Sequence, residues 1–143
     1  MTSNTKLGIV STLLIHPDAQ SDLRRLMASS NTDDKSAGAT ILALLQQAKC
    51  DPAILRSLLE HGFGGDRKAR YEVSKWLRYW NAGYNLWRLK IWTDPRGSLP
   101  YRIVYAYQSH ATRYYVLAIV HREFDYRSDH EITQRVLKAY GEL

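Results

Sequence analysis

The segment VLAIVHREFDY, residues 116–126, ends an apolar run with side chains that can transfer protons and bind anions. A histidine titrates near neutral pH, so His121 could act as a general acid or a general base. Arginine binds phosphate through paired hydrogen bonds, and Arg122 could fill that role. Tyr126 could donate a proton or stack on a base. Together these residue types suit proton transfer beside a bound phosphate group.

One reaction of this kind is the cleavage of RNA by attack of a 2′-hydroxyl on its own phosphate. It would need a base for the 2′-hydroxyl, cations for the charge that develops on the phosphate, and an acid for the departing 5′-oxygen. Glu123 and Asp125 are alternative bases, although carboxylates among arginines tend to stay ionised and paired. The reaction needs no metal ion, and the five histidines are scattered without a His/Cys pair at ligand spacing. We therefore expect no metal and no cofactor. A purely structural interpretation also remains open, in which the histidine is hydrogen-bonded at a strand end and the tyrosine packs on the last helix.

Further cations lie on two predicted strands upstream. Side chains alternate between the two faces of a strand. In LWRLKIW this places Arg88 and Lys90 on one face, opposite the apolar residues. In YRIVYAY, Arg102 shares a face with Val104 and Ala106. We expect the three cations to line one shallow surface, although half-solvated antiparallel sheets often alternate charge with core in the same way.

The same alternation in YYVLAIVHR predicts that His121 and Arg122 point to opposite faces. It groups Arg122 on one face with Tyr114, Val116, Ala118 and Val120. For His121 and Arg122 to reach one phosphate, the strand has to twist or end between them.

The elements around these residues predict an α+β fold with one domain over residues 1–143. The apolar run of residues 7–15 favours a strand, and Pro17 suits the first turn of a helix. Ser128 and Glu131 predict a capping box at the start of the last helix. The remaining predicted elements are helices at 37–49 and 51–62, strands at 71–80, 84–92, 101–108 and 114–120, and a last helix that ends at Gly141. We expect a helical section at about 17–62, then an antiparallel sheet of about four strands and a final helix at about 71–143.

The charge is concentrated in the second half of the chain. Residues 1–65 hold six Lys or Arg and six Asp or Glu, whereas residues 66–143 hold fourteen and eight, so the net charge of +6 lies there. All ten tyrosines and all four tryptophans also follow residue 70. A basic and aromatic half suits nucleic acid, especially RNA, although a tyrosine-rich sheet with solvated cations would have the same composition. The segment DRKAR, residues 66–70, adds a separate basic loop.

The single cysteine, Cys50, excludes an internal disulfide framework and a cysteine-based zinc site. This fits a reducing compartment such as a bacterial cytoplasm. No signal peptide is expected, because the first apolar run lacks a cleavage site, and no segment approaches the ~20 apolar residues of a membrane span. We expect a cytoplasmic protein without a membrane partner.

The order LWRLKIW, YRIVYAY and YYVLAIVHREFDY ahead of a last helix resembles the RelE/ParE superfamily of toxins from bacterial type II toxin–antitoxin systems. It is most similar to the RelE/HigB-like branch of mRNA interferases. The likeness extends from about Leu86 to the C-terminus, and the N-terminal strand and helices match less closely.

The resemblance implies a toxin that inhibits translation by cutting mRNA on the ribosome, without a metal ion. It also implies a cognate antitoxin that forms a hetero-oligomer with the toxin and silences it. Carried over by position, it implies catalytic roles for Arg88, Lys90, Arg102, His121 and Tyr126, and RNA binding by Arg88, Lys90, Arg102 and Arg122. A partly disordered antitoxin segment would cover the surface of the first three residues or displace the last helix.

Two other functions remain open. A ParE-like toxin would bind DNA gyrase and trap its DNA breaks without any catalysis of its own. A simple RNA-binding module would bind RNA without cutting it. The pair His121 and Arg122 favours the nuclease, because a gyrase-binding protein needs no group for proton transfer.

Overall fold

The computed structural model describes residues 11–94, 96–124 and 126–143. It has the expected α+β class, with helices before, within and after the run of sheet strands. In chain order the elements are β1 (Thr12–Ile15), α2 (Pro17–Met27), α3 (Thr32–Cys50), α4 (Pro52–Ser57), β2 (Tyr71–Lys75), α5 (Leu77–Trp80), β3 (Leu86–Thr93), β4 (Gly97–Gln108), the short 3-10 helix η1 (Ser109–Ala111), β5 (Arg113–His121) and α6 (Glu131–Gly141).

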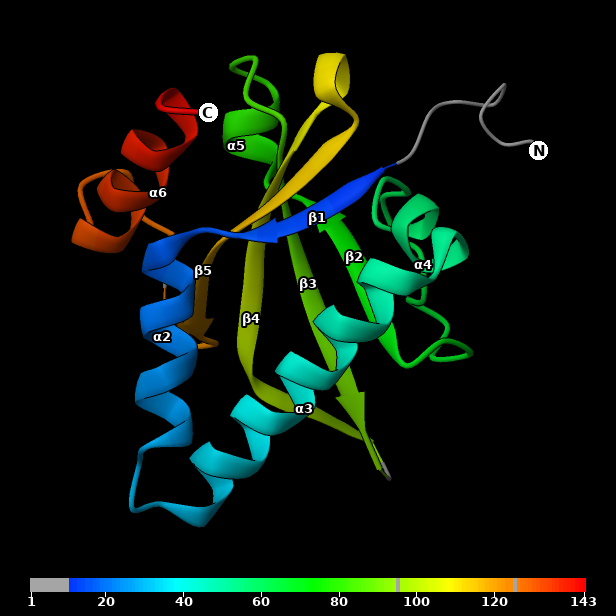
Figure 1. The fold of residues 1–143 in the computed structure, drawn as a ribbon, viewed down its shortest axis with the longest axis vertical. Helices are drawn as coiled ribbons and strands as arrows, with labels where there is room; N and C mark the ends of the chain where they lie inside the picture. The colour runs from blue at the N-terminus through cyan, green and yellow to red at the C-terminus, as the bar shows by residue number, and fades with distance from the viewer. Residues whose placement is uncertain (1–10, 95, 125) are drawn as a thin grey trace.

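The five strands form one mixed sheet in the order β1-β5-β4-β3-β2 (Figure 1). Strands β2 to β5 are antiparallel neighbours, as expected. The expectation of a purely antiparallel sheet of about four strands is corrected by β1, which pairs in parallel with β5 from Thr12 to Ile15. Local patterns predict a strand but not its partner, so this pairing was not accessible from the sequence. Residues 7–10 of the predicted first strand lie outside the described residues.

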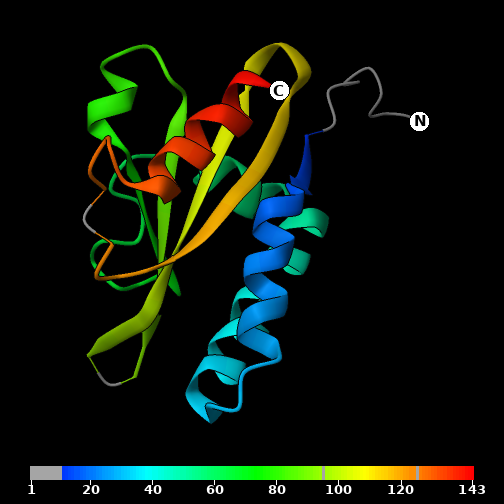
Figure 2. The ribbon, with the colours of Figure 1, turned by 90° about the vertical axis from the view of Figure 1, so that its left-hand side faces the viewer.

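Helices cover the two faces of the sheet unequally (Figure 2). Helices α2, α3 and α4 bury one face over a core of aliphatic side chains with three tyrosines and a tryptophan. Helix α6 and the α5 region cover part of the other face, over a second core that includes Trp76, Leu117 and Val136. The rest of this second face is open at β2, β3 and the distal part of β4. Within the described residues, no helix is long and apolar enough to cross a membrane.

The predicted strand at residues 71–80 is half wrong. Strand β2 ends at Lys75, and α5 follows at once. The Trp76 N–H still donates to the Leu86 carbonyl at 3.0 Å, so the chain turns at the end of the ladder. The turn lets Trp76 and Tyr79 pack edge to face, with ring centroids 4.9 Å apart, and both are buried. Burying two aromatic rings outweighs the β propensity of the segment.

Two helices begin where the sequence patterns did not place them. Helix α3 starts at Thr32 rather than at residue 37, because the Asn31 side chain accepts hydrogen bonds from the backbone N–H groups of Asp33 and Asp34. Helix α6 lacks the predicted capping box. Its cap is His130, whose Nδ1 accepts the Ile132 N–H at 3.0 Å.

The predicted alternation is wrong for one half of β5, because the strand contains a β-bulge. Val104 pairs with Ala118 and Tyr105 pairs with Val116, so Leu117 is an extra residue. Before the bulge, Tyr114 and Val116 point toward α2 and α3. After it, Ala118 and Val120 point toward α6. The sequence analysis placed these four residues on one face. A bulge cannot be recognised there, because the extra residue is apolar like its neighbours in the run.

A buried carboxylate joins three elements at the edge of β5. Asp22 on α2 is 3% exposed. Its Oδ2 accepts the Ile119 N–H of β5 at 2.9 Å and Nη2 of Arg135 on α6 at 2.7 Å. Its Oδ1 accepts Nη1 of Arg135 at 3.2 Å. Because β1 ends at Ile15, Asp22 takes over as partner of the β5 edge and connects α2 to α6.

Candidate functional site

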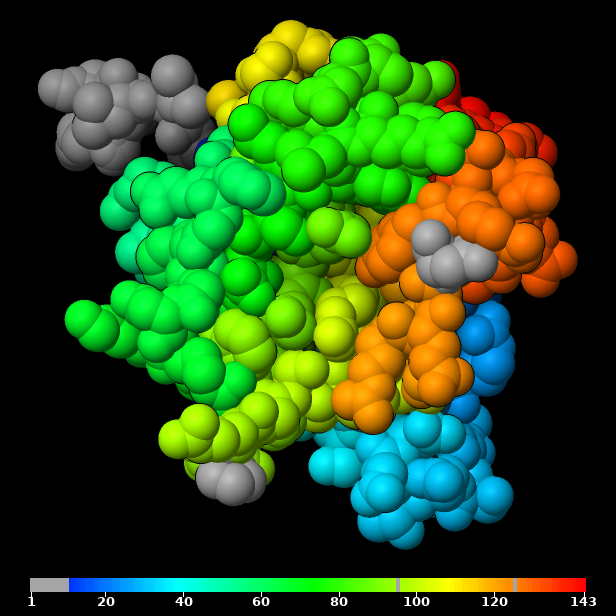
Figure 3. Space-filling view, turned by 180° about the vertical axis from the view of Figure 1, so that it is seen from behind, coloured from blue at the N-terminus to red at the C-terminus, as the bar shows by residue number. Residues whose placement is uncertain are grey.

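A hollow of about 410 Å³ opens on the sheet face that α2 and α3 do not cover. Figure 3 shows it between the strands β2 and β3 on one side and the segment after β5 on the other. We call it the basic pocket. Its lining residues are Glu72 and Ser74 of β2, Arg88, Leu89 and Lys90 of β3, Arg102 of β4, and Arg122 and Tyr126 of the segment after β5.

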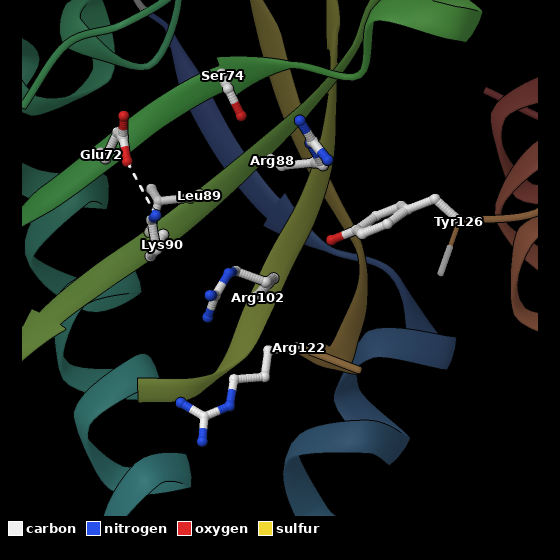
Figure 4. A pocket seen from close by; sticks show the side chains of 8 residues that line it. All are labelled: Glu72, Ser74, Arg88, Leu89, Lys90, Arg102, Arg122 and Tyr126. Carbon is white, nitrogen blue, oxygen red and sulfur yellow. Dashed lines mark ion pairs between the residues drawn. The ribbon is translucent and has the colours of Figure 1, made fainter. Parts of the chain in front are cut away.

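Strand register gathers the polar side chains of the basic pocket. Glu72, Lys90 and Arg102 are direct partners across three strands and form one row. Ser74 and Arg88 are partners in the adjacent row. Lys90 Nζ lies 3.2 Å from a Glu72 oxygen, the ion pair drawn in Figure 4. Four cations and one carboxylate line the pocket, so its potential is positive.

Arg102 forms the centre of the charge cluster. Its Nη1 donates to the Leu99 carbonyl at 2.7 Å, which fixes the guanidinium at the floor of the pocket. The pKa of Arg102 is lowered, mainly by burial, with further lowering by Arg122 and Arg88, while Tyr126 acts in the opposite direction. Arginine still remains protonated under any ordinary condition. Three guanidinium groups that repel one another form a surface that an anion would stabilise.

Arg88 contributes a buried donor that is not satisfied within the described residues. Its Nε is buried and has no hydrogen-bond partner there. Its Cζ lies 4.9 Å from the centroid of the Tyr126 ring, a cation–π contact. Buried donors normally have a partner, so the Arg88 guanidinium is incompletely hydrogen-bonded among the described residues.

Tyr126 enters the pocket from the segment between β5 and α6. Its ring packs against Phe124, with centroids 4.5 Å apart, and edge-on against Trp76 at 5.1 Å. Its φ of 60° is unusual for a residue other than glycine, and such strain persists only where the surrounding packing imposes it. Figure 4 shows the hydroxyl pointing toward Arg88 and Arg102.

The Tyr126 hydroxyl is a proton donor at neutral pH. Burial raises its pKa, and the charges of Arg88 and Arg102 together with a hydrogen bond to Arg88 offset only part of that rise. The net direction is upward from an ordinary value of 10.0. The phenol is therefore protonated and can donate to an oxygen atom in the pocket.

His121 lies away from the basic pocket. It is the direct partner of Tyr101, and the two rings meet edge to face with centroids 5.3 Å apart. Tyr101 in turn donates to Asp34 of α3, on the helix-covered side of the sheet. The His121 Nδ1 accepts the Glu123 N–H at 3.1 Å, which is the hydrogen-bonded strand end that the structural interpretation expects.

The structure thus brings together five of the six residues predicted from the sequence and separates His121 from them. The gathered residues are Arg88, Lys90, Arg102, Arg122 and Tyr126. Of the alternative bases, Glu123 does not line the pocket and its side chain is 85% exposed. Asp125 lies outside the described residues. In the parts of the chain that the structure describes, no group of three His, Cys, Asp or Glu side chains could hold a metal ion.

Sequence reasoning missed Glu72 and Ser74. The alternation in YEVSK places both on the polar face of β2, so their direction was accessible. Their position opposite Lys90 and Arg88 was not, because it depends on the register between β2 and β3.

Comparison with known proteins agrees with the sequence patterns. A family model described as ParE toxin of type II toxin–antitoxin system, parDE, matches residues 13–126. A solved structure of a double arginine-to-alanine mutant of the E. coli toxin RelE in the free state is similar, with 14% sequence identity, a TM-score of 0.46, and coverage of 92% of this chain and 98% of that chain. No curated protein sequence matches. The family match extends over most of the chain and confirms the superfamily expected from the sequence: the chain belongs to the ParE toxin family of type II toxin–antitoxin systems.

Proposed function

We propose that this toxin is an endoribonuclease that cuts mRNA on the ribosome and that the basic pocket is its active site. The observation that carries the proposal is the convergence of four cations, a tyrosine hydroxyl and a carboxylate on one hollow. Cations bind the RNA backbone, and groups that exchange protons beside them supply what backbone cleavage needs. A site on the ribosome would place the toxin in the cytoplasm, and family membership implies a cognate antitoxin that silences it there.

In the proposed reaction, Glu72 accepts the proton of the 2′-hydroxyl as its oxygen attacks the adjacent phosphorus. Arg88, Arg102 and Arg122 stabilise the charge that develops on the phosphate oxygens. The bond from phosphorus to the 5′-oxygen breaks, and Tyr126 donates the proton that the 5′-oxygen takes up. The products are a 2′,3′-cyclic phosphate and a free 5′-hydroxyl. Lys90 holds Glu72 through their ion pair and adds positive charge to the pocket.

This assignment gives the proton-transfer roles to Glu72 and Tyr126 instead of His121. Its reason is geometric: a catalytic acid or base has to reach the reacting oxygen within hydrogen-bond distance or through one water. The His121 ring packs on Tyr101, on the other face of the sheet.

A second candidate function is that of a gyrase poison. The observation in its favour is the family match, because the matching family is described as the toxin of parDE. Under this alternative the cations would bind a protein or DNA surface and Tyr126 would have only a packing role.

One paired experiment distinguishes the two functions. The purified toxin is incubated with ribosomes that carry a defined mRNA, with the same mRNA alone, and with gyrase and supercoiled plasmid. Primer extension maps mRNA cuts, and gel electrophoresis reports trapped DNA breaks. We expect cuts only in the ribosome reaction and no trapped breaks. Trapped breaks with intact mRNA would replace the nuclease by the gyrase poison, and binding without either product would leave an RNA-binding module.

We predict that Tyr126→Phe slows cleavage by about a hundredfold, because general acid catalysis typically contributes at least that factor. His121→Ala is expected to leave the rate close to that of the wild type. The phenylalanine ring keeps the packing on Phe124 and Trp76, so thermal unfolding of the variant should resemble that of the wild type. Single-turnover rates on ribosomes provide the measurement. The opposite order, with an active phenylalanine variant and an inactive alanine variant, would return the acid–base role to His121.

The direction of the Tyr126 pKa shift adds a pH dependence to this prediction. Because the pKa is raised, the proton-donating form is fully present below about pH 10 and is lost only as pH rises through the raised value. The wild-type rate should therefore show no loss attributable to Tyr126 between about pH 6 and pH 9. A rate that falls through this range in the wild type but not in the phenylalanine variant would contradict the assignment.

A further inference from the structure

A second basic groove lies beside the pocket, where the loop after α4 meets the end of β3. It is lined by the loop Arg67–Arg70, by Trp92 and its neighbours on β3, and by Thr40 of α3, and its volume is about 670 Å³. We propose that this loop groove binds the sugar–phosphate backbone of RNA outside the step that is cut. The inference rests on the proposed function and adds a second RNA subsite to it.

The cations of the loop groove are not neutralised by ion pairs among the described residues. Arg67 Nη2 donates to the backbone carbonyls of Thr93, at 2.9 Å, and Gly97, at 3.2 Å. Arg70 Nη2 donates to the side-chain amide oxygen of Gln47. Both partners are neutral, so the guanidinium charges remain available to a ligand. This differs from Lys90 in the pocket, which has a carboxylate partner.

Lys68 differs from the two arginines of the groove in having no side-chain partner among the described residues. It is exposed, and within the described residues its ammonium group makes no hydrogen bond or ion pair. Two acids lie nearby: Asp94 lines the groove, and Asp66 accepts the backbone N–H of Lys68. Three cations against these two carboxylates leave the loop groove positive, although less so than the pocket.

The loop is held in a fixed shape against the sheet. Gly64 has a φ of +79°, and a Cβ there would lie 1.8 Å from the Tyr71 carbonyl oxygen, so only glycine fits. Its carbonyl accepts the Trp92 indole N–H at 2.8 Å. The Arg70 carbonyl accepts the Trp92 backbone N–H, also at 2.8 Å. A preformed groove loses less conformational entropy on binding than a mobile loop would.

Trp92 joins the loop groove to the basic pocket. Its ring lies 4.2 Å from Arg67 Cζ and 4.7 Å from Lys90 Nζ. A cation of each site therefore contacts the same indole, which places the two hollows next to each other. An RNA strand held at a phosphate in the pocket has to continue beyond it, and this exit offers guanidinium groups beside an aromatic ring, which RNA-binding surfaces commonly use.

Two sources of the same backbone chemistry could fill the loop groove: the mRNA next to the cut, or ribosomal RNA. The variant that tests both is Lys68→Gln, since its exposed side chain has no contact to lose. Lys138→Gln is the matched control, because it removes one exposed positive charge on α6, away from the loop groove. Both variants are measured by fluorescence anisotropy with a non-cleavable 2′-O-methyl RNA of about 12 nucleotides, with a trinucleotide of the same chemistry, and with vacant ribosomes.

We expect Lys68→Gln to weaken binding of the longer RNA several-fold and to lower the slope of log affinity against log salt by about one, with the trinucleotide unaffected. That result identifies the mRNA strand as the ligand. A loss seen only with vacant ribosomes identifies ribosomal RNA instead. Wild-type affinity in both arms overturns the proposal, whatever the variant does to antitoxin binding. If the wild type cuts mRNA on ribosomes while Lys68→Gln binds RNA normally, only the proposal for the loop groove is contradicted. If the wild type cuts no mRNA, the proposed nuclease function is contradicted.

Discussion

Replacing Arg102 by alanine is expected to lower the rate of mRNA cleavage by about a hundredfold to a thousandfold, the usual loss when one donor to a developing negative charge is removed. Arg102 is fixed by the Leu99 carbonyl and lies in one row with Lys90 and Glu72, at the centre of the pocket. Its guanidinium is therefore positioned before the substrate binds. The measurement is the single-turnover rate on ribosomes that carry a defined mRNA.

Two further variants separate charge from geometry. Arg102→Lys keeps the charge but loses the planar, paired donors, so we expect a rate between those of the wild type and Arg102→Ala. Arg24→Ala removes an exposed arginine on α2, on the other side of the sheet, and should leave the rate unchanged. An Arg102→Ala protein that is folded and cuts like the wild type would exclude the basic pocket as the active site.

The second large effect is on stability. Asp22→Ala is expected to lower the free energy of unfolding by about 3 kcal/mol, because a buried backbone N–H loses its acceptor and the partly exposed Arg135 loses two charged hydrogen bonds. The change leaves Arg135 without its paired acceptor and the Ile119 N–H without a partner. It also removes one of the contacts between α2 and α6. Urea denaturation with linear extrapolation gives the difference.

Asp18→Ala is the matched control for that experiment. Asp18 is also on α2, but its carboxylate is 3.9 Å from Arg135 Nε and is 37% exposed. A solvated pair of this kind contributes about 1 kcal/mol or less. Equal losses in the free energy of unfolding of the two variants would show that the buried Asp22 contacts stabilise the fold no more than a solvated pair does.

The sequence predicts those features of the site that depend on alternation within one strand. Arg88 and Lys90 share a face because they are two residues apart on β3, and Arg102 joins them because it follows the same rule on β4. The α+β class and the last helix follow from local patterns in the same way. Tyr126 was predicted as a site residue from the family pattern. Its separation from Arg122 along the chain does not by itself indicate that both side chains reach one pocket.

The features that the sequence did not predict depend on contacts between distant segments. Glu72 lies in the site because the register between β2 and β3 places it opposite Lys90. Leu117 is an extra residue in β5, so the side chains that follow it point to the other face of the sheet from the one that alternation predicts. Strand β2 ends early because the Trp76 ring packs against Tyr79, Phe124 and Tyr126. His121, by contrast, lies on the opposite face from Arg122, as the alternation along its strand predicted. Residue types suggested the proposed chemistry, whereas strand register and the bulge decided which side chains lie together.

The most direct test of the central claim replaces a single 2′-hydroxyl. Primer extension first maps the nucleotide at which the wild-type toxin cuts a defined mRNA on ribosomes. The same mRNA is then made with a 2′-deoxy sugar at that nucleotide alone. We predict that the all-ribose mRNA is cut there and that the substituted mRNA is not, since the attacking hydroxyl is missing. Equal cutting of both, or no cutting of the all-ribose mRNA, would contradict the account.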